Sequence, residues 1–147
     1  MRWRHTTEVS RGVDRESASR QDEGRGRGDE MSQADDTEGV IASFNEAFNR
    51  HDVDGVMALM TDDVVFENTS PAPDGERFVG QTNVRAFWER FFAESPNAHF
   101  EAEEIATAGD RCTVRWRYDW GGGHIRGIDL FRVRDGKVAE KLSYVKG

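Results

Sequence analysis

The sequence predicts an α+β domain: a cone-shaped α+β barrel in which three N-terminal helices pack on a curved, mainly antiparallel sheet around an apolar pocket. Apolar residues recur at helical spacing in three segments before residue 95, which indicates helices with one buried face. After residue 98, apolar and polar residues alternate in segments that glycine-containing turns separate, which is typical of antiparallel strands. Helices followed by a run of strands fold as a sheet with helices on one face.

The three predicted helices occupy the first half of the domain. The first covers 40–50, where apolar residues form one stripe. Asp52 can cap a second, short helix, which buries the apolar residues of 53–60. The third helix follows a capping residue, Thr82 or Asn83, and presents one face of valine and aromatic side chains.

The predicted strands are rich in β-branched and aromatic residues, and the longer ones alternate. A loop is expected over 69–77, where Pro71 and Pro73 would interrupt a strand. The strands are expected at 64–68, 78–80, 100–105, 112–120, 125–133 and 138–145.

We expect residues 1–38 to be a disordered tail and residues 39–147 to form the folded domain. The tail has few large apolar side chains and densely mixed charges, so it cannot bury enough surface to offset the entropy of ordering. Met31 followed by Ser32 suggests a translation start, with residues 1–30 as an upstream extension.

Charge, hydropathy and cysteine content argue against several classes of protein. The formal net charge of −8 disfavours binding to nucleic acid or to anionic membranes. No apolar run approaches the ~20 residues of a membrane span, and the first residues lack the apolar core of a secretory signal. Cys112 is the only cysteine and is expected in the core, so we expect no internal disulfide. We expect a cytoplasmic protein with no metal and no cofactor.

The order of the predicted elements and three sequence segments resemble the nuclear-transport-factor-2-like superfamily, in its SnoaL-like and ketosteroid-isomerase-like branches. The resemblance covers residues 40–147 and implies the fold described above. It does not imply one reaction, because this fold hosts isomerases, cyclases, dehydratases, epoxide hydrolases and binding modules. The segments are Phe48-Asn49-Arg50-His51-Asp52-Val53-Asp54, Leu59-Met60-Thr61-Asp62-Asp63-Val64-Val65-Phe66 and Asp129-Leu130-Phe131-Arg132-Val133-Arg134-Asp135-Gly136-Lys137-Val138-Ala139-Glu140.

The resemblance to the isomerases implies three functional positions, and this chain matches one of them. The isomerases place a basic aspartate at the end of the first strand, where this chain has Asn68. They place a tyrosine on the first helix, where it has Phe44, and an acid on the penultimate strand, where it has Asp129. A single carboxylic acid without a partner base cannot move a proton between two carbons as these isomerases do. The sequence therefore argues against ketosteroid isomerisation.

The resemblance to the epoxide hydrolases of the same fold is also incomplete. These enzymes use an arginine and an aspartate two residues apart on one strand, and Arg117 and Asp119 match that pair. Ser143 stands where their second aspartate would be. The alternation of the strand places Arg117 and Asp119 on its polar face, so a solvated surface pair is the other interpretation.

Asp129 is the first candidate for a catalytic group, with Lys141 as its partner. The residues two positions before and after Asp129 are Gly and Phe, so its side chain points to the buried face of the sheet, where an unpaired carboxylate is costly. A three-residue turn over 134–136 would pair Asp129 with Lys141 and place Ser143 on the same face, whereas a two-residue turn would pair Asp129 with Leu142. We expect the first. The alternatives are an aspartate satisfied by backbone amides and an aspartate at the rim of the sheet.

Aromatic side chains and a few polar groups are expected to surround a ligand cavity. Many of these side chains must also serve as core, so the polar ones are the sharper markers of a site. The expected ligand-binding residues are Phe44, Phe48, Met57, Phe66, Asn68, Phe87, Phe91, Trp116, Tyr118, Phe131 and Ser143.

Two classes of function follow. The first is an enzyme, an isomerase, cyclase, dehydratase or hydrolase, that uses Asp129 as an acid–base group on a small hydrophobic molecule. The second is a non-catalytic ligand-binding or accessory module that dimerises through its sheet. Leu142 and Tyr144 would lie on the outer face, where an exposed apolar patch suggests a homodimer interface.

Overall fold

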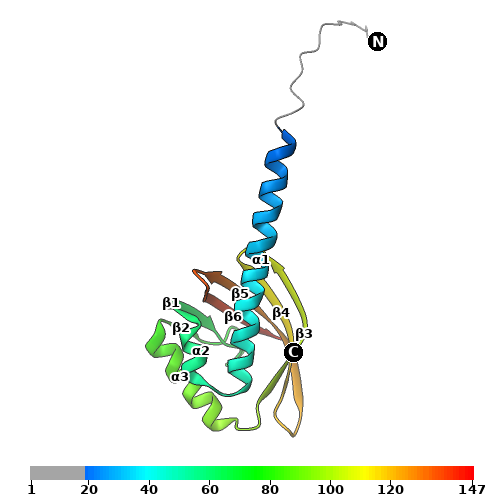
Figure 1. Cartoon of the computed structure of the whole chain (residues 1–147). Coiled ribbons are helices and arrows are strands. Elements are labelled where there is room, and N and C mark those ends of the chain that lie inside the picture. Colours follow the sequence, from blue (N-terminus) through cyan, green and yellow to red (C-terminus); the bar gives the residue numbers. More distant parts are fainter. Residues whose placement is uncertain (1–18) are drawn as a thin grey trace, which may run out of the picture.

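The computed structural model describes residues 19–147, which form three helices and one six-stranded sheet (Figure 1). The order along the chain is α1 (Ser19–Asn49), α2 (Val53–Ala58), β1 (Met60–Glu67), β2 (Arg77–Val79), α3 (Gln81–Glu94), β3 (His99–Ala108), β4 (Arg111–Asp119), β5 (His124–Arg134) and β6 (Lys137–Val145).

The sheet has the strand order β2-β1-β6-β5-β4-β3. Strands β3 to β6 form the predicted antiparallel meander, and β1 joins it by pairing in parallel with β6. β2 and β3 remain at the two edges, so the sheet curves but does not close into the barrel that the sequence suggested. The predicted α+β class, with three helices on a mainly antiparallel sheet, is confirmed.

The helices cover one face of the sheet, which encloses the core between the two layers (Figure 1). α1 packs on β3, β4 and β6, while α3 packs on β1 and β2. Phe48 of α1 is the centre of the contact between α1 and α3, because its ring lies edge-on to Trp88 at 5.0 Å and to Phe92 at 4.9 Å between ring centroids. Aromatic contacts of this kind join α1 and α3 within the helix layer.

Short polar interactions fix the joints between the elements. Asp52 caps α2 as predicted, because its Oδ1 accepts a hydrogen bond of 3.0 Å from the Gly55 backbone N–H. α3 follows Gly80, whose φ of 83° suits glycine, and no side-chain cap bonds its first turn. Instead, Gln81 Nε2 donates to backbone carbonyls at the end of α2 and the start of β1, which ties the three elements together.

The hairpin between β5 and β6 differs from both registers considered from the sequence. Its turn has two residues, Asp135 and Gly136, both with positive φ, as a type I′ turn requires. A bulge then leaves Ala139 without a partner, because Val133 pairs with Val138 while Arg132 pairs with Glu140. As a result Asp129 pairs with Ser143 rather than with Lys141 or Leu142.

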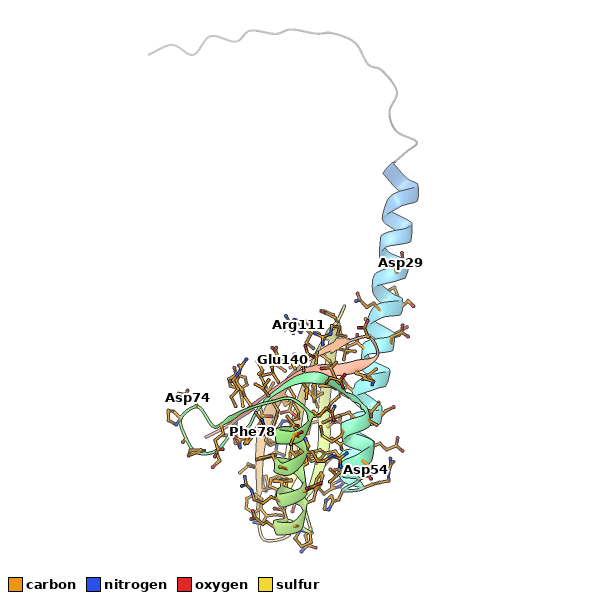
Figure 2. The ribbon with its side chains drawn as sticks, turned by 90° about the vertical axis from the view of Figure 1, so that its left-hand side faces the viewer. Asp29, Asp54, Asp74, Phe78, Arg111 and Glu140 are labelled. Carbon is orange, nitrogen blue, oxygen red and sulfur yellow. The ribbon has the colours of Figure 1, made fainter. Side chains whose placement is uncertain are left out.

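Residues 19–38, which the sequence analysis expected to be part of a disordered tail, belong to α1, and residues 1–18 lie outside the described part of the chain. The boundary of the folded domain at residue 39 stays a prediction. Thr37 is only 3% exposed, and its Oγ1 donates a hydrogen bond of 2.7 Å to the Gly109 carbonyl in the β3–β4 turn. The helical turn around Thr37 is held against the domain, and this contact offsets the cost of nucleating the helix. The polar residues that precede it can then continue the helix. Near Asp29 the helix extends away from the domain (Figure 2).

The single cysteine lies beneath this contact. Cys112 on β4 is buried, as predicted, and its Sγ lies 3.6 Å from Thr107 Oγ1. The same hydroxyl lies 3.4 Å from a carboxylate oxygen of Glu38 on α1. Burial raises the pKa of the Cys112 thiol, so the thiol stays protonated and unreactive while α1 is docked.

We predict that deleting residues 1–30 leaves the midpoint of thermal unfolding unchanged, whereas deleting residues 1–38 lowers it. The second deletion removes the buried Thr37 and its hydrogen bond to Gly109. Thr37→Val alone should lower the free energy of unfolding by about 1 kcal/mol, because one buried hydrogen bond is lost while the side-chain shape is kept. Scanning calorimetry checks both, with the exposed Ser32→Ala as the control. A loss of stability on deleting residues 1–30 would contradict the prediction.

Candidate functional site

A cavity of about 140 Å³ lies between the helices and the sheet face that they cover. Rings of α1, α3 and the strands form most of its wall, and one cluster of polar side chains comes from β5 and β6. The lining residues are Phe44, Asn45, Phe48, Phe66, Asn68, Thr69, Phe87, Trp88, Phe91, Phe100, Ala102, Val114, Trp116, Tyr118, Ile125, Asp129, Lys141 and Ser143.

Two of the predicted site residues, Met57 and Phe131, do not line this cavity. Each is 2% exposed and belongs to the core, with the Phe131 ring packed against Phe44 at 5.6 Å between centroids. Apolar spacing identifies a buried face but cannot separate the residues beneath a cavity wall from those in it. The other predicted residues line the cavity: Phe44, Phe48, Phe66, Asn68, Phe87, Phe91, Trp116, Tyr118, Asp129, Lys141 and Ser143.

Several lining residues were not among the predicted ones. Trp88 shares the apolar face of α3 with Phe87 and Phe91, and Val114 shares the alternation of Trp116 and Tyr118, so both signals were present in the sequence. Phe100 and Ala102 alternate with Glu101 and Glu103, and Ile125 shares the strand face of Asp129, so these three also carried a signal. Asn45 and Thr69 are polar and carried none.

Asp129, Lys141 and Ser143 form a closed polar triad at the wall of the cavity. Lys141 Nζ lies 3.1 Å from Asp129 Oδ2 and donates a hydrogen bond of 2.8 Å to Ser143 Oγ. The Ser143 hydroxyl donates a hydrogen bond of 2.7 Å to the other carboxylate oxygen, Asp129 Oδ1. One oxygen of the carboxylate therefore accepts a hydrogen bond and the other is paired with an ammonium, as a buried charge requires.

The hairpin register explains this convergence. Asp129 and Ser143 are direct partners across β5 and β6, and Lys141 lies two residues from Ser143 on the same face. With the two-residue turn alone, the even-numbered residues of β6, such as Leu142, would face the cavity. The bulge at Ala139 shifts β6 by one residue, so the odd-numbered residues face it instead. Lys141 and Ser143 consequently face the cavity, as predicted, although the predicted pairing was wrong.

The triad lies in apolar surroundings. Asp129 and Lys141 are each 6% exposed. The Lys141 ammonium lies over three aromatic rings, at 4.9 Å from the centroid of Phe66, 5.6 Å from Trp88 and 5.8 Å from Phe131. Ring faces attract cations, and the attraction is stronger where water is excluded. Lys141 is therefore held by the carboxylate on one side and by aromatic faces on the other.

Asn68, at the position that is a basic aspartate in the isomerases, also has a role in the loop beside the cavity. Its Oδ1 accepts hydrogen bonds from the backbone N–H groups of Glu76, at 2.7 Å, and Ser70, at 3.4 Å. These bonds fasten both ends of the β1–β2 loop, whose tip carries Asp74 and projects from the domain (Figure 2). The amide oxygen is committed to this loop and is not a base.

Arg117 and Asp119, the pair that resembles the epoxide hydrolases, do not line the cavity. They bond one another at 3.2 Å on partly exposed positions near the end of β4. The Gly121 backbone N–H and then the Arg117 guanidinium hold the pKa of the Asp119 carboxyl below its usual value. This is the solvated surface pair that the strand alternation also allowed.

Gly127 makes room for one aromatic wall of the cavity. It pairs with Trp116 across β4 and β5, and a Cβ at position 127 would lie 2.4 Å from Cζ2 of that indole. Such a distance is far below van der Waals contact, so any larger residue would displace the ring. Glycine at this position lets Trp116 lie flat over the strand at the cavity.

Two further findings bear on the kind of protein this is. No helix within residues 19–147 has the length and apolar character needed to cross a membrane. Within the same residues, no three His, Cys, Asp or Glu side chains gather as a metal site would require.

The fold and the aromatic cavity define a protein of the nuclear-transport-factor-2-like class. A family model described as a SnoaL-like domain matches residues 41–141. The chain therefore belongs to the SnoaL-like domain family, as its sequence segments indicated. Among curated proteins, none matches the chain.

Solved structures of similar proteins support the same assignment. An NTF2-like protein of unknown function from Mesorhizobium loti is 40% identical, covers 78% of this chain and 94% of its own, and superposes with a TM-score of 0.70. A candidate polyketide cyclase from Xanthomonas campestris is 23% identical over 78% of this chain and 93% of its own, with a TM-score of 0.63. A candidate ketosteroid isomerase from Kribbella flavida is 18% identical over 78% and 80%, with a TM-score of 0.67. The last two show likeness of fold alone.

We predict that Lys141→Met lowers the free energy of unfolding by about 3–5 kcal/mol, because it leaves the Asp129 carboxylate buried without a cation. Adding Asp129→Asn to that variant should recover most of the loss, since the remaining amide carries no charge. Denaturant unfolding measures both, and Lys146→Met on the exposed end of the chain is the control. An unchanged stability of the Lys141→Met variant would show that the pair is not a buried ion pair in solution.

Proposed function

We propose that this protein binds a small hydrophobic molecule in the aromatic cavity and moves a proton on it with Asp129. One observation carries the proposal: a buried carboxylate and a buried ammonium stand side by side in the wall of an otherwise apolar cavity. Such convergent polar groups in a concave apolar site are typical of ligand-binding and catalytic pockets. The family is consistent with the proposal but does not name the reaction.

The chemistry that suits these groups is proton removal from a carbon next to a carbonyl. The Asp129 carboxylate takes the proton, the electron pair of the C–H bond forms a C=C bond, and the π pair of the carbonyl moves to its oxygen, which gives an enolate. An N–H of Lys141 donates to that oxygen and stabilises its charge. Return of the proton from Asp129 to the far carbon of a conjugated enolate is an isomerisation, while attack of the enolate carbon on a second carbonyl closes a ring and leaves an alkoxide that takes the proton from Asp129. In this scheme Lys141 carries the charge of the oxygen, so Asp129 acts as the only base, in contrast to the expectation from the sequence that a partner base is needed.

A non-catalytic binding protein is the second candidate, and the closed triad favours it. One oxygen of Asp129 already accepts a hydrogen bond from Ser143, and the other is paired with the Lys141 ammonium. In that case the carboxylate only fixes Lys141, which then offers a hydrogen bond to a bound oxygen. An epoxide hydrolase is the least supported candidate, because Arg117 and Asp119 lie outside the cavity.

We predict that the protein accelerates exchange of the α-protons of cyclic ketones in D₂O, and that Asp129→Asn slows this exchange by about 10²–10⁴-fold. Proton NMR on a panel of ketones with one to four rings measures the rate. Asp119→Asn, which removes a carboxylate outside the cavity, is the matched control and should keep the wild-type rate. Binding without any acceleration by the wild-type protein would favour the non-catalytic candidate.

We also propose a homodimer that forms through the outer face of the sheet. The sheet-face patch, defined as Ile128, Leu130, Leu142 and Tyr144, lies on the face that the helices leave uncovered. Ile128 and Leu130 are each 39% exposed and Tyr144 is 57% exposed, which is unusual for adjacent large apolar side chains. A cytoplasmic location and the lack of nucleic-acid binding remain predictions from charge and composition.

We predict that light scattering at micromolar concentration reports twice the chain mass, and that the double variant Leu130→Glu with Tyr144→Glu reports the monomer. Each protomer would bring two unpaired carboxylates, four in the dimer, to the interface, and burying them would cost more than an interface of ordinary size tolerates. Met31→Glu changes an apolar side chain, 69% exposed, on α1 away from the sheet, and should remain dimeric. A monomeric wild-type chain would contradict the proposal.

A further inference from the structure

The size of the cavity limits its ligand. Its volume of about 140 Å³ is far below the roughly 300–1,000 Å³ of pockets that hold drug-sized molecules. It is close to the ~150 Å³ of an engineered apolar cavity that holds benzene. A molecule of one or two rings fills this space, and a molecule with four fused rings does not.

The charge of the cavity also limits its ligand. Among the residues of 19–147 that line it, only Asp129 and Lys141 are charged, and they neutralise each other at 3.1 Å. A charged ligand would bring an unbalanced charge into apolar surroundings, which costs several kcal/mol unless a partner is present. The site is therefore suited to an uncharged molecule.

The donors of the cavity select the polar group of the ligand. An ammonium has three N–H donors. Within the described residues, Lys141 donates one hydrogen bond, to Ser143, and its Nζ lies 3.1 Å from the Asp129 carboxylate. A third N–H of Lys141 reaches no acceptor in the described part of the chain, and an oxygen of a ligand in the cavity can accept from it.

From these three features we infer that the ligand is an uncharged molecule of one or two rings that carries a carbonyl or hydroxyl oxygen. This inference rests on the proposed binding function and narrows it to one chemical class. Planar rings suit the walls, because Phe87, Phe91 and Phe66 present ring faces and edges to the same space. The oxygen would point to the polar side of the cavity, where Lys141 and Ser143 lie.

The test compares three probes by equilibrium dialysis against the full chain. The first is 1-tetralone, a neutral ketone with two rings; the second is 1-naphthoate, an anion of similar size; the third is progesterone, a neutral ketone with four rings. We expect 1-tetralone to bind at least about ten-fold more tightly than either of the others, because each of them violates one limit. Lys141→Met should weaken the binding of 1-tetralone, and calorimetry selects conditions in which this variant is folded.

A matched pair of substitutions shows whether the probe occupies this cavity. Ala102 and Ala106 are both exposed residues of β3, and of the two only Ala102 lines the cavity. Ala102→Phe should abolish binding of 1-tetralone by filling the cavity, whereas Ala106→Phe should leave it unchanged. Equal binding by both variants would place the probe elsewhere and overturn the inference.

The remaining outcomes separate the inference from the proposed function. Preferred binding of progesterone would overturn the size limit, and preferred binding of 1-naphthoate would overturn the charge limit, while in both cases a ligand-binding cavity would stand. Binding of none of the three at millimolar concentration would overturn the proposed binding function together with the inference.

Discussion

The unpaired residue Ala139 decides which side chains of β6 reach the cavity. The two-residue turn at Asp135 and Gly136 would, by itself, place Leu142 opposite Asp129. The bulge advances β6 by one residue, so Ser143 takes that place and Lys141 follows on the same face. Because the side chains of a strand alternate, a slip of one residue would bury Leu142 in the cavity and expose the ammonium. The polar triad, the cation over aromatic rings and the apolar outer face all depend on this single register.

Much of the fold, and which polar residues face the cavity, could be predicted because both follow from the spacing of apolar residues within single helices and strands. The alternation of Trp116 and Tyr118 and the position of Asp129 place their side chains on the inner face without reference to other strands. The bulge could not be predicted in this way, because Val138 and Ala139 are both apolar and either can be buried. The same limit explains why Phe131 and Met57 were predicted to line the cavity. The spacing of apolar residues shows that they are buried, but not that they lie in the core beneath the cavity. Helix formation before residue 39 depends on docking to a distant turn, which a polar sequence does not reveal.

The energetics of the triad favour a role beyond the fold. Relative to apolar residues of the same volume, a buried ion pair adds little net stability and often none. The core around it is already dense with aromatic contacts, such as those between Phe66, Trp88 and Phe87. Apolar residues in place of both Lys141 and Asp129 would pack in that core at least as well. A charged pair in this position is therefore explained more simply by binding of a ligand in the cavity than by the stability of the sheet.

The buried thiol of Cys112 gives the chain a built-in reporter of local opening. It is the only cysteine, and it lies where Glu38 of α1 approaches Thr107 of β3. A reagent that alkylates thiolates can reach it only when this part of the layer separates, so the labelling rate measures the population of the opened state. The population of the state in which α1 has detached can thus be followed in the unaltered protein, under conditions in which the sheet remains folded.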